Sequence, residues 1–186
     1  MTRRGLLARA MARIATLISL LLAGLAATPL WAAGTTGAEF FMQTFGDLKG
    51  ELAAARKSQL KGVVLIYEMD GCPFCERLKR VALQSVKVRE YYHANFLVYR
   101  VDIKGSTPLT GFDGVELTES AFASRQGVRG TPTIVFYGLN GAETTRLVGP
   151  PSDAAEFLLL GRYAADGHYK SGSFASFRQG QRPAGS

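Results

Sequence analysis

The sequence predicts an α/β domain built on a mixed sheet of four, or five, strands with helices on both faces. Short, β-branched apolar runs alternate with stretches rich in helix-forming residues, which is typical of strands joined by helical crossovers and paired in parallel. The last two runs are joined by Asn140-Gly141, a hairpin signal that favours antiparallel pairing. The chain has 186 residues, enough for one domain with its own core.

The first half of the domain is expected to run helix, strand, helix, helix, strand. Residues 38–59 are rich in helix formers, and apolar residues recur there at steps of three and four. The inward positions of this amphipathic helix would be Phe41, Phe45, Leu48, Leu52 and Ala55. A buried strand is predicted over 63–67, a helix from Pro73 onward, a second helical stretch over 86–93 and a strand over 96–103.

The second half is expected to begin with a loop insertion over 104–116, which is rich in glycine. A short helix over 118–126 follows, with a threonine as its N-cap. Strands over 133–137 and 144–148 form the hairpin, and a final helix covers 152–165. The inward residues of that helix would be Phe157, Leu158 and Leu160.

The N-terminus has the pattern of a secretory signal peptide over residues 1–33. A basic start is followed by a mostly apolar stretch over 14–30 and then by small residues. A retained membrane anchor is the alternative, because the apolar stretch is at the short edge for a membrane span. The pair Arg3-Arg4 also resembles a twin-arginine export signal. Either route predicts a periplasmic location, where a thiol pair meets oxidising conditions.

The charge and composition make several classes of function unexpected. The net charge is +7, but four arginines of the leader supply much of it, and no run of five like charges occurs. A nucleic-acid partner is therefore not expected, because phosphate binding needs clustered basic side chains. The sequence also lacks a glycine-rich phosphate loop and a nicotinamide or flavin fingerprint, so no cofactor is expected.

The chemistry is expected at Cys72-Pro73-Phe74-Cys75, which contains both cysteines of the chain. This motif follows a predicted buried strand and opens a helix. The free N–H groups and the dipole at a helix start stabilise an anion, so the pKa of the Cys72 thiol should be lowered there. Cys75 lies three residues later on the same helical turn, and we expect it to be more buried and to act as the resolving thiol.

These residues give the chain a resemblance to the thioredoxin superfamily. The resemblance depends on Gly71-Cys72-Pro73-Phe74-Cys75 after a strand and on the segment Gly127 to Thr133 before one. It implies a thioredoxin-like domain over 38–166, followed by a C-terminal tail over 167–186. It also implies that Pro132 is a cis proline beside the active disulfide, and that Thr131 and Pro132 bind the substrate chain.

Within that superfamily the chain is most similar to the periplasmic SoxW-like thioredoxins, which are associated with bacterial sulfur oxidation. The similarity covers about residues 38 to 177, and the matching stretches are Tyr67 to Cys72, Asn95 to Leu97, Arg125 to Thr133, Gly149 to Pro151, and Tyr169 with Phe174. This resemblance implies a thiol donor to sulfur-carrier proteins or their partners that is recharged by a membrane thiol-electron transporter. We expect a monomer that reduces disulfides of protein partners, because the domain leaves no room for the added domain through which isomerases of this superfamily dimerise.

Two departures from the family pattern bear on mechanism. Ordinary thioredoxins carry a buried aspartate six residues before the first cysteine, where this chain has Ile66. Glu68 lies two residues along on the same strand face, and we hypothesise that it assists deprotonation of Cys75; a merely hydrogen-bonded or surface glutamate is the alternative. The pair Pro73-Phe74 is nearer to glutaredoxins than to thioredoxins. A neutral ring at Phe74 replaces the histidine of the strong oxidases, which favours a reductase.

Other functions remain open at this stage. The protein could be a disulfide oxidase or isomerase, or a redox-inert copper-handling module, although copper sites of this kind usually have one more residue between the cysteines. A purely structural disulfide would close too small a ring to stabilise the fold much. His93 and His168 have no metal-ligand spacing with the cysteines, so no metal site is expected.

Overall fold

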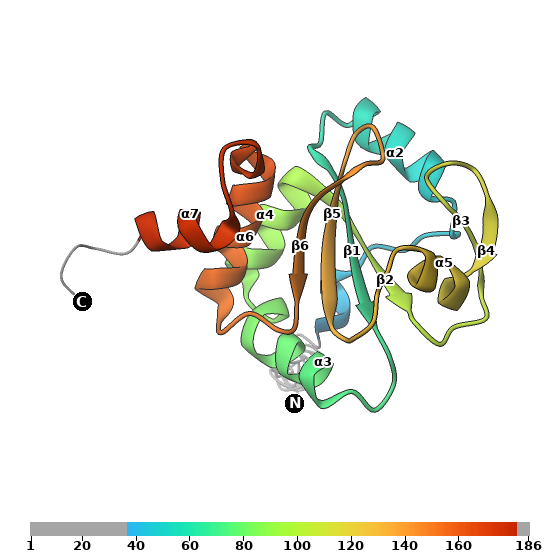
Figure 1. Cartoon of the computed structure of the whole chain (residues 1–186), viewed down its shortest axis with the longest axis horizontal. Coiled ribbons are helices and arrows are strands. Elements are labelled where there is room, and N and C mark those ends of the chain that lie inside the picture. The colour runs from blue at the N-terminus through green and yellow to red at the C-terminus, as the bar shows by residue number, and fades with distance from the viewer. Residues whose placement is uncertain (1–36, 182–186) are drawn as a thin grey trace, which may run out of the picture. The chain divides into compact units, whose positions relative to one another are not determined.

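A computed structural model describes residues 37–181 and contains a four-stranded mixed sheet in the order β2-β1-β5-β6 (Figure 1). The strands are β1 (Gly62–Glu68), β2 (Phe96–Asp102), β5 (Thr133–Gly138) and β6 (Glu143–Val148). β1 pairs with β2 in parallel, whereas β5 pairs antiparallel with both β1 and β6. The predicted mixed sheet is therefore confirmed with four strands, and no fifth strand joins it within the described range.

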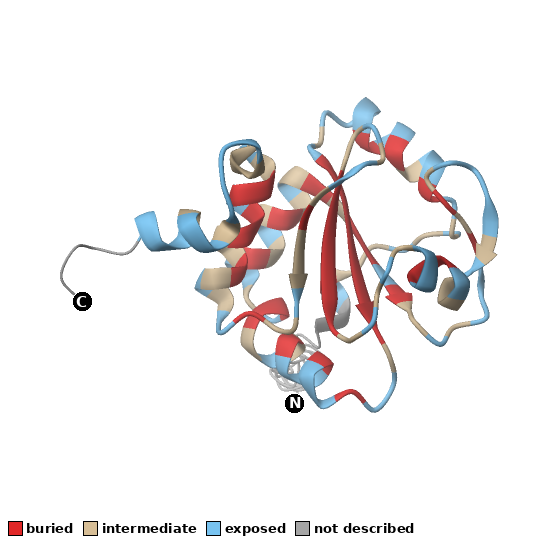
Figure 2. Ribbon diagram, viewed as in Figure 1, coloured by how far each residue is buried: buried red, intermediate tan, exposed pale blue. Residues whose placement is uncertain are grey.

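The central strand β1 is buried along its whole length (Figure 2). Its side chains alternate between two separate apolar clusters, as the period-two geometry of a strand requires. Val64 and Ile66 belong to the first cluster, and Val63, Leu65 and Tyr67 belong to the second. The continuous apolar run in the sequence thus follows from helices covering both faces of the sheet.

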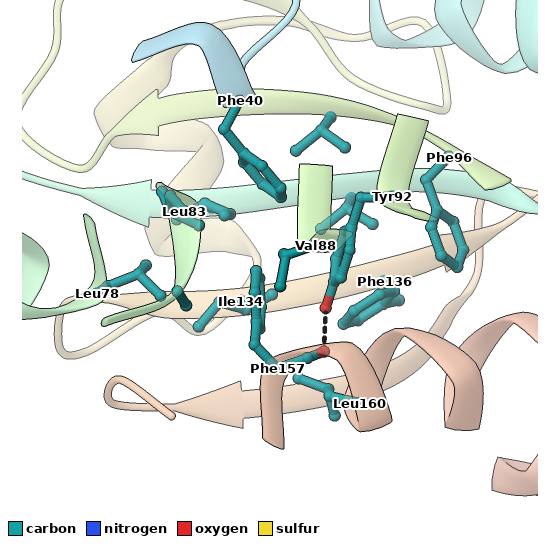
Figure 3. Packing of buried hydrophobic residues seen from close by; sticks show 14 of the residues in the cluster. Phe40, Leu78, Leu83, Val88, Tyr92, Phe96, Ile134, Phe136, Phe157 and Leu160 are labelled. Atoms are coloured by element: carbon teal, nitrogen blue, oxygen red, sulfur yellow. Dashed lines mark hydrogen bonds between the residues drawn. The ribbon is translucent and has the colours of Figure 1, made fainter. Parts of the chain in front are cut away.

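The first face of the sheet is covered by most of the helices. These are η1 (Gly37–Phe40), α3 (Pro73–Leu78), the π-helical segment η2 (Lys79–Leu83), α4 (Val86–Asn95) and α6 (Ala154–Ala165). Figure 3 shows the middle of this cluster, where Tyr92 of α4 and Phe157 of α6 stack with their ring centroids 4.5 Å apart. The tyrosine hydroxyl donates to the backbone carbonyl of that phenylalanine at 2.8 Å, so this buried polar atom is paired.

The second face is covered by α2 (Leu48–Lys57) and α5 (Glu119–Arg125). The α5 helix begins after Thr118, whose side chain accepts a hydrogen bond from a backbone N–H of the first turn, which confirms the predicted cap. A hairpin of β3 (Pro108–Thr110) and β4 (Glu116–Thr118) lies at the edge of this face. The sequence predicted only a loop over 104–116, and this expectation was wrong because Leu109 turns inward and joins the core.

The predicted helix over 38–59 was wrong in its first half. The helix begins at Leu48, where Asp47 accepts a hydrogen bond from a backbone N–H, and Gly46 adopts a positive φ that interrupts any earlier helix. Phe45, predicted to face the core, is fully exposed. Phe40 is the buried ring instead, and it packs on the aromatic cluster of the first face.

The C-terminal tail carries more structure than expected. It contains η3 (His168–Lys170) and α7 (Phe174–Gly180). The rings of Phe174 and Phe177 each lie with their centroids 5.5 Å from that of Tyr163, whose hydroxyl donates to the Gly172 carbonyl at 2.6 Å. The tail therefore packs on α6 at least as far as α7.

The predicted signal peptide over 1–33 lies outside the described residues. Within residues 37–181, no helix is long and apolar enough to cross a membrane.

Candidate active site

Cys72 and Cys75 form a disulfide at the N-terminus of α3. Cys72 is the N-cap, Pro73 occupies the first turn, and Gly71 supplies the positive φ that turns the chain from β1 into the helix. The Sγ of Cys72 accepts a hydrogen bond from the backbone N–H of Cys75 at 3.1 Å. Cys72 is 4% exposed and Cys75 is 1% exposed, so the first cysteine is the more accessible of the two. The local sequence thus places Cys72 where a helix N-terminus can stabilise a thiolate.

The turn before β5 meets Cys72 across a sequence separation of 59 residues. The Thr131 hydroxyl donates to the Sγ of Cys72 at 3.2 Å, and the Thr131 carbonyl oxygen lies 3.5 Å from the same sulfur. The Thr131–Pro132 peptide bond is cis. Both sequence-predicted elements of the site, the cysteine motif and the Thr131-Pro132 turn, are therefore in contact.

Exposed apolar residues neighbour the residues of this contact. The ring of Phe74 is 59% exposed beside the disulfide, and Pro73 is also exposed. Val148, another exposed apolar residue, lies opposite Thr133 in the β5–β6 ladder, next to the cis proline. An uncovered apolar surface next to a reactive group is typical of a site for macromolecular partners.

Glu68 is a buried carboxylate between two cations. It projects from β1 on the same face as Ile66, as the sequence predicted, and lies 3.6 Å from Lys79 Nζ and 3.3 Å from an Arg100 guanidinium nitrogen. Burial raises the pKa of Glu68, and the charges of Lys79 and Arg100 act in the opposite direction. Its Oε2 atom has no hydrogen-bond partner. The structure therefore presents a carboxylate able to take up a proton, although its contacts are with the two cations rather than with a sulfur atom.

The sequence prediction missed both cations. Arg100 interrupts an apolar strand pattern, and this was the available signal. Lys79 follows Cys75 by one helical turn, and its backbone N–H donates to the Cys75 carbonyl. Only the packing of η2 on β1 brings its side chain to Glu68.

The two histidines are engaged in other contacts. His93 donates from Nε2 to the Phe40 carbonyl at 2.9 Å, and the ring of His168 stacks on Phe177. Across the described part of the chain, no group of three or more His, Cys, Asp or Glu side chains is arranged to hold a metal ion.

A disulfide at a helix start, facing a Thr–cis-Pro turn on a mixed four-stranded sheet, defines a protein with a dithiol–disulfide site on an α/β scaffold. A family model described as a thioredoxin-like domain matches residues 48–165, well over half of the sequence. The chain therefore belongs to the thioredoxin-like domain family, and the predicted thioredoxin-like fold is confirmed.

Solved structures give the same fold. A thioredoxin-fold protein from Helicobacter pylori is 22% identical, with a TM-score of 0.61 over 79% of this chain and 90% of that one. A thioredoxin from Thermus thermophilus is 28% identical, with a TM-score of 0.50 over 66% of this chain and 88% of that one. A DsbH oxidoreductase is 19% identical, with a TM-score of 0.51 over 62% and 79% of the two chains. No curated protein sequence matches significantly. Family, fold and cysteine pair together support a thiol–disulfide oxidoreductase.

Proposed function

We propose that this protein is a periplasmic thiol–disulfide oxidoreductase that reduces disulfides of protein partners. The observation that carries the proposal is the Cys72–Cys75 disulfide at the start of α3 in contact with the Thr131 turn. The exposed Phe74, which precedes Cys75, and the exposed Val148, which lies opposite Thr133, support a protein partner, because both leave apolar surface uncovered next to residues of the site. One similar structure is named an oxidoreductase and another a thioredoxin, which is consistent with redox chemistry at this cysteine pair.

The reaction begins from the reduced protein. The Cys72 thiolate attacks one sulfur of the partner disulfide, which forms a mixed disulfide and releases the other partner sulfur as a thiolate that takes up a proton. Cys75 then loses its proton and attacks the Sγ of Cys72. The Cys72–Cys75 disulfide forms, the second partner sulfur leaves as a thiolate, and two electrons have passed to the partner.

Glu68 is the acceptor that we propose for the proton of Cys75. It is a buried carboxylate on the face of β1 against which α3 and η2 pack, and its burial raises its pKa toward the range where it can accept a proton. Lys79, one turn after Cys75 at the end of α3, forms an ion pair with Glu68 and so connects the carboxylate to the helix that carries the cysteines.

The same proposal includes the direction of the reaction, the source of electrons and the cellular location. The neutral Phe74 next to Cys75 stabilises a thiolate less than a histidine would, which favours a reductase over an oxidase or isomerase. A reductase leaves each turnover oxidised, so we propose a membrane thiol-electron transporter as its source of electrons. The basic, apolar leader supports export to the periplasm, and the SoxW-like resemblance supports a link to sulfur oxidation.

Trapping of the mixed disulfide tests the mechanism. Cys75→Ser should retain attack by Cys72 but lose resolution, so covalent adducts with partner proteins should accumulate and disappear on treatment with dithiothreitol. Cys72→Ser is the matched control and should form no adducts and reduce no insulin. A Cys75→Ser protein that forms no adducts, together with a wild type that does not reduce insulin, would contradict the proposal; a copper titration would then test the copper-handling alternative.

A further inference from the structure

The segment from Gln126 to Pro132, which presents Thr131 to Cys72, is fixed by hydrogen bonds rather than by close packing of its glycines. It connects α5 to β5 and runs to the end of the sheet where α3 begins (Figure 1). A Cβ atom added at Gly127 or Gly130 would meet no heavy atom within 4 Å. Glycine gives a backbone the most freedom to lose, so the order of this segment must come from other contacts. Val128 packs against the second core cluster and donates its backbone N–H to the Ala123 carbonyl at 3.0 Å, and hydrogen bonds hold both ends of the segment.

At its first end the segment is held through Gln126. The Oε1 of Gln126 accepts a hydrogen bond from the Tyr137 hydroxyl at 3.3 Å, and the Tyr67 and Tyr137 hydroxyl oxygens lie 2.8 Å apart. The backbone carbonyl of Gln126 accepts from the Arg146 guanidinium at 2.9 Å. Arg146 is in turn fixed by two hydrogen bonds to the Glu143 carboxylate. Strands β1, β5 and β6 thus all contribute to one anchor.

At its second end the segment is held through the residues around Pro132. The Thr133 hydroxyl, which is buried, donates to the Gly130 carbonyl at 2.7 Å. The backbone N–H of Gly149 donates to the Pro132 carbonyl at 2.8 Å. Between the two anchors, Arg129 is exposed and Thr131 touches the sulfur.

We infer that Tyr137 and Thr133 are positioning residues. They keep the binding edge, which is the backbone at Thr131 and Pro132, ordered for an extended polypeptide substrate. This inference rests on the proposed function, since it assigns the edge to a protein partner. Binding of a substrate chain to an edge that is already ordered costs less conformational entropy than binding to an edge that becomes ordered only on binding. Neither side chain touches the reacting sulfur atoms, so both act on binding of a long substrate and not on exchange with a small disulfide.

The first test compares Tyr137→Phe with Tyr99→Phe. Each change removes one hydroxyl from a buried tyrosine on the same face of the sheet, but the Tyr99 hydroxyl donates to Glu51, away from the Gln126 anchor. With dithiothreitol as reductant, Tyr137→Phe should raise the KM for insulin by about three- to tenfold, the effect of one net hydrogen bond. The kcat for insulin and the rate with oxidised glutathione should stay within about twofold of wild type. A similar rise in KM for Tyr99→Phe, or no rise for Tyr137→Phe, would overturn the inference.

The second test does not depend on activity. Amide hydrogen exchange of residues 127–131 should be faster in Tyr137→Phe and in Thr133→Val than in wild type, and unchanged in Tyr99→Phe. If the wild type fails to reduce insulin, the proposed function is wrong, and faster exchange would still support the anchoring role. If exchange of these residues does not change in either variant, the anchoring role is wrong whatever the activity.

Discussion

At the scale of single residues, the contact between Thr131 and Cys72 has the most direct effect on the chemistry of the site. A hydroxyl that donates to sulfur stabilises a thiolate more than a thiol, since the interaction is stronger when the acceptor is charged. The N-terminus of α3 acts in the same direction, through the backbone N–H of Cys75 that donates to the same sulfur. Cys72 therefore has two local causes for a lowered thiol pKa in the reduced protein.

Replacing Thr131 with valine should weaken this effect without a large change in side-chain volume. In Thr131→Val, the pKa of the Cys72 thiol should rise, and alkylation by iodoacetamide at pH 6 should slow by about tenfold, the effect of losing a hydrogen bond to a charged atom. The measurement is the rate of alkylation against pH for the reduced protein. Thr107→Val is the control at an exposed threonine, and it should leave the profile unchanged. Identical profiles for Thr131→Val and wild type would argue against the hydroxyl contact as a cause.

Glu68 should make stability depend on pH with a defined sign. Burial raises its pKa above the ordinary value of 4.5, so folding favours the protonated form. The favourable contribution of the neutral carboxyl is fully present below that ordinary pKa and is lost as the pH rises through the folded-state pKa. Glu68→Gln should therefore unfold at a higher temperature than wild type at pH 7, and the difference should shrink to near zero below pH 4. A variant less stable than wild type at pH 7 would show that the pairs with Lys79 and Arg100 outweigh burial.

The same substitution separates the structural effect from the catalytic one. If Glu68 accepts the proton of Cys75, Glu68→Gln should slow insulin reduction and alter its pH profile. An unchanged rate and profile would exclude that role, whatever the change in stability.

At the scale of whole elements, the N-terminal segment shows how helix boundaries and burial are decided. Residues 37–40 form a short 3-10 helix whose last residue, Phe40, enters the core, and the chain then crosses to Gly46 before α2 begins. Met42 donates its backbone N–H to Val98, so this crossing segment also pairs with the edge strand β2. The segment therefore occupies one backbone carbonyl on the outer side of β2.

Phe40 and Phe45 offer a matched pair for testing this arrangement. Phe40→Ala should lower the free energy of unfolding by about 3–5 kcal/mol, because it removes a fully buried ring from the aromatic cluster. Phe45→Ala should change it by less than about 0.5 kcal/mol, since that ring is exposed. Urea denaturation measures both. Equal effects of the two substitutions would contradict the observed position of the segment.

At the scale of the whole molecule, the C-terminal extension from Gly167 onward is distant in sequence from the two cysteines, and it packs on α6. Tyr163 of α6 contacts Phe174 and Phe177, and Arg178 of α7 forms an ion pair with Glu156. Contacts of this kind add to the stability of the first face without touching the cysteines.

Deletion of residues 167–186 should therefore separate stability from activity. The shortened protein should lose about 1–3 kcal/mol of unfolding free energy, because Tyr163 becomes uncovered. Its rate of insulin reduction, measured below the unfolding temperature, should equal that of the full chain. A large loss of activity in a folded shortened protein would assign the extension a part in substrate binding.

Much of the architecture could be predicted from local sequence. β1 and β5 are continuous apolar runs, and their burial on both faces follows from that composition. The hairpin between β5 and β6 was predicted from Asn140-Gly141, and in the structure Gly141 has a positive φ in this turn. The position of the disulfide at a helix start followed from the order of strand, turn and motif. Each of these features depends on residues that are close together in the chain, so their spacing can be read from the sequence.

The sequence by itself determined the mixed four-stranded sheet and the placing of Cys72 at the start of α3, because periodicity, turn residues and capping act over a few residues. Only the tertiary structure decided that Phe40 and not Phe45 enters the core, that Leu109 folds inward, that Glu68 meets Lys79 and Arg100, and that Tyr137 and Thr133 hold the turn at Thr131. Each of these outcomes is a contact between segments far apart along the chain, or a choice between nearby apolar side chains for one place in the core. Such outcomes depend on the volume and the partners available once all the layers have packed, which no local pattern records.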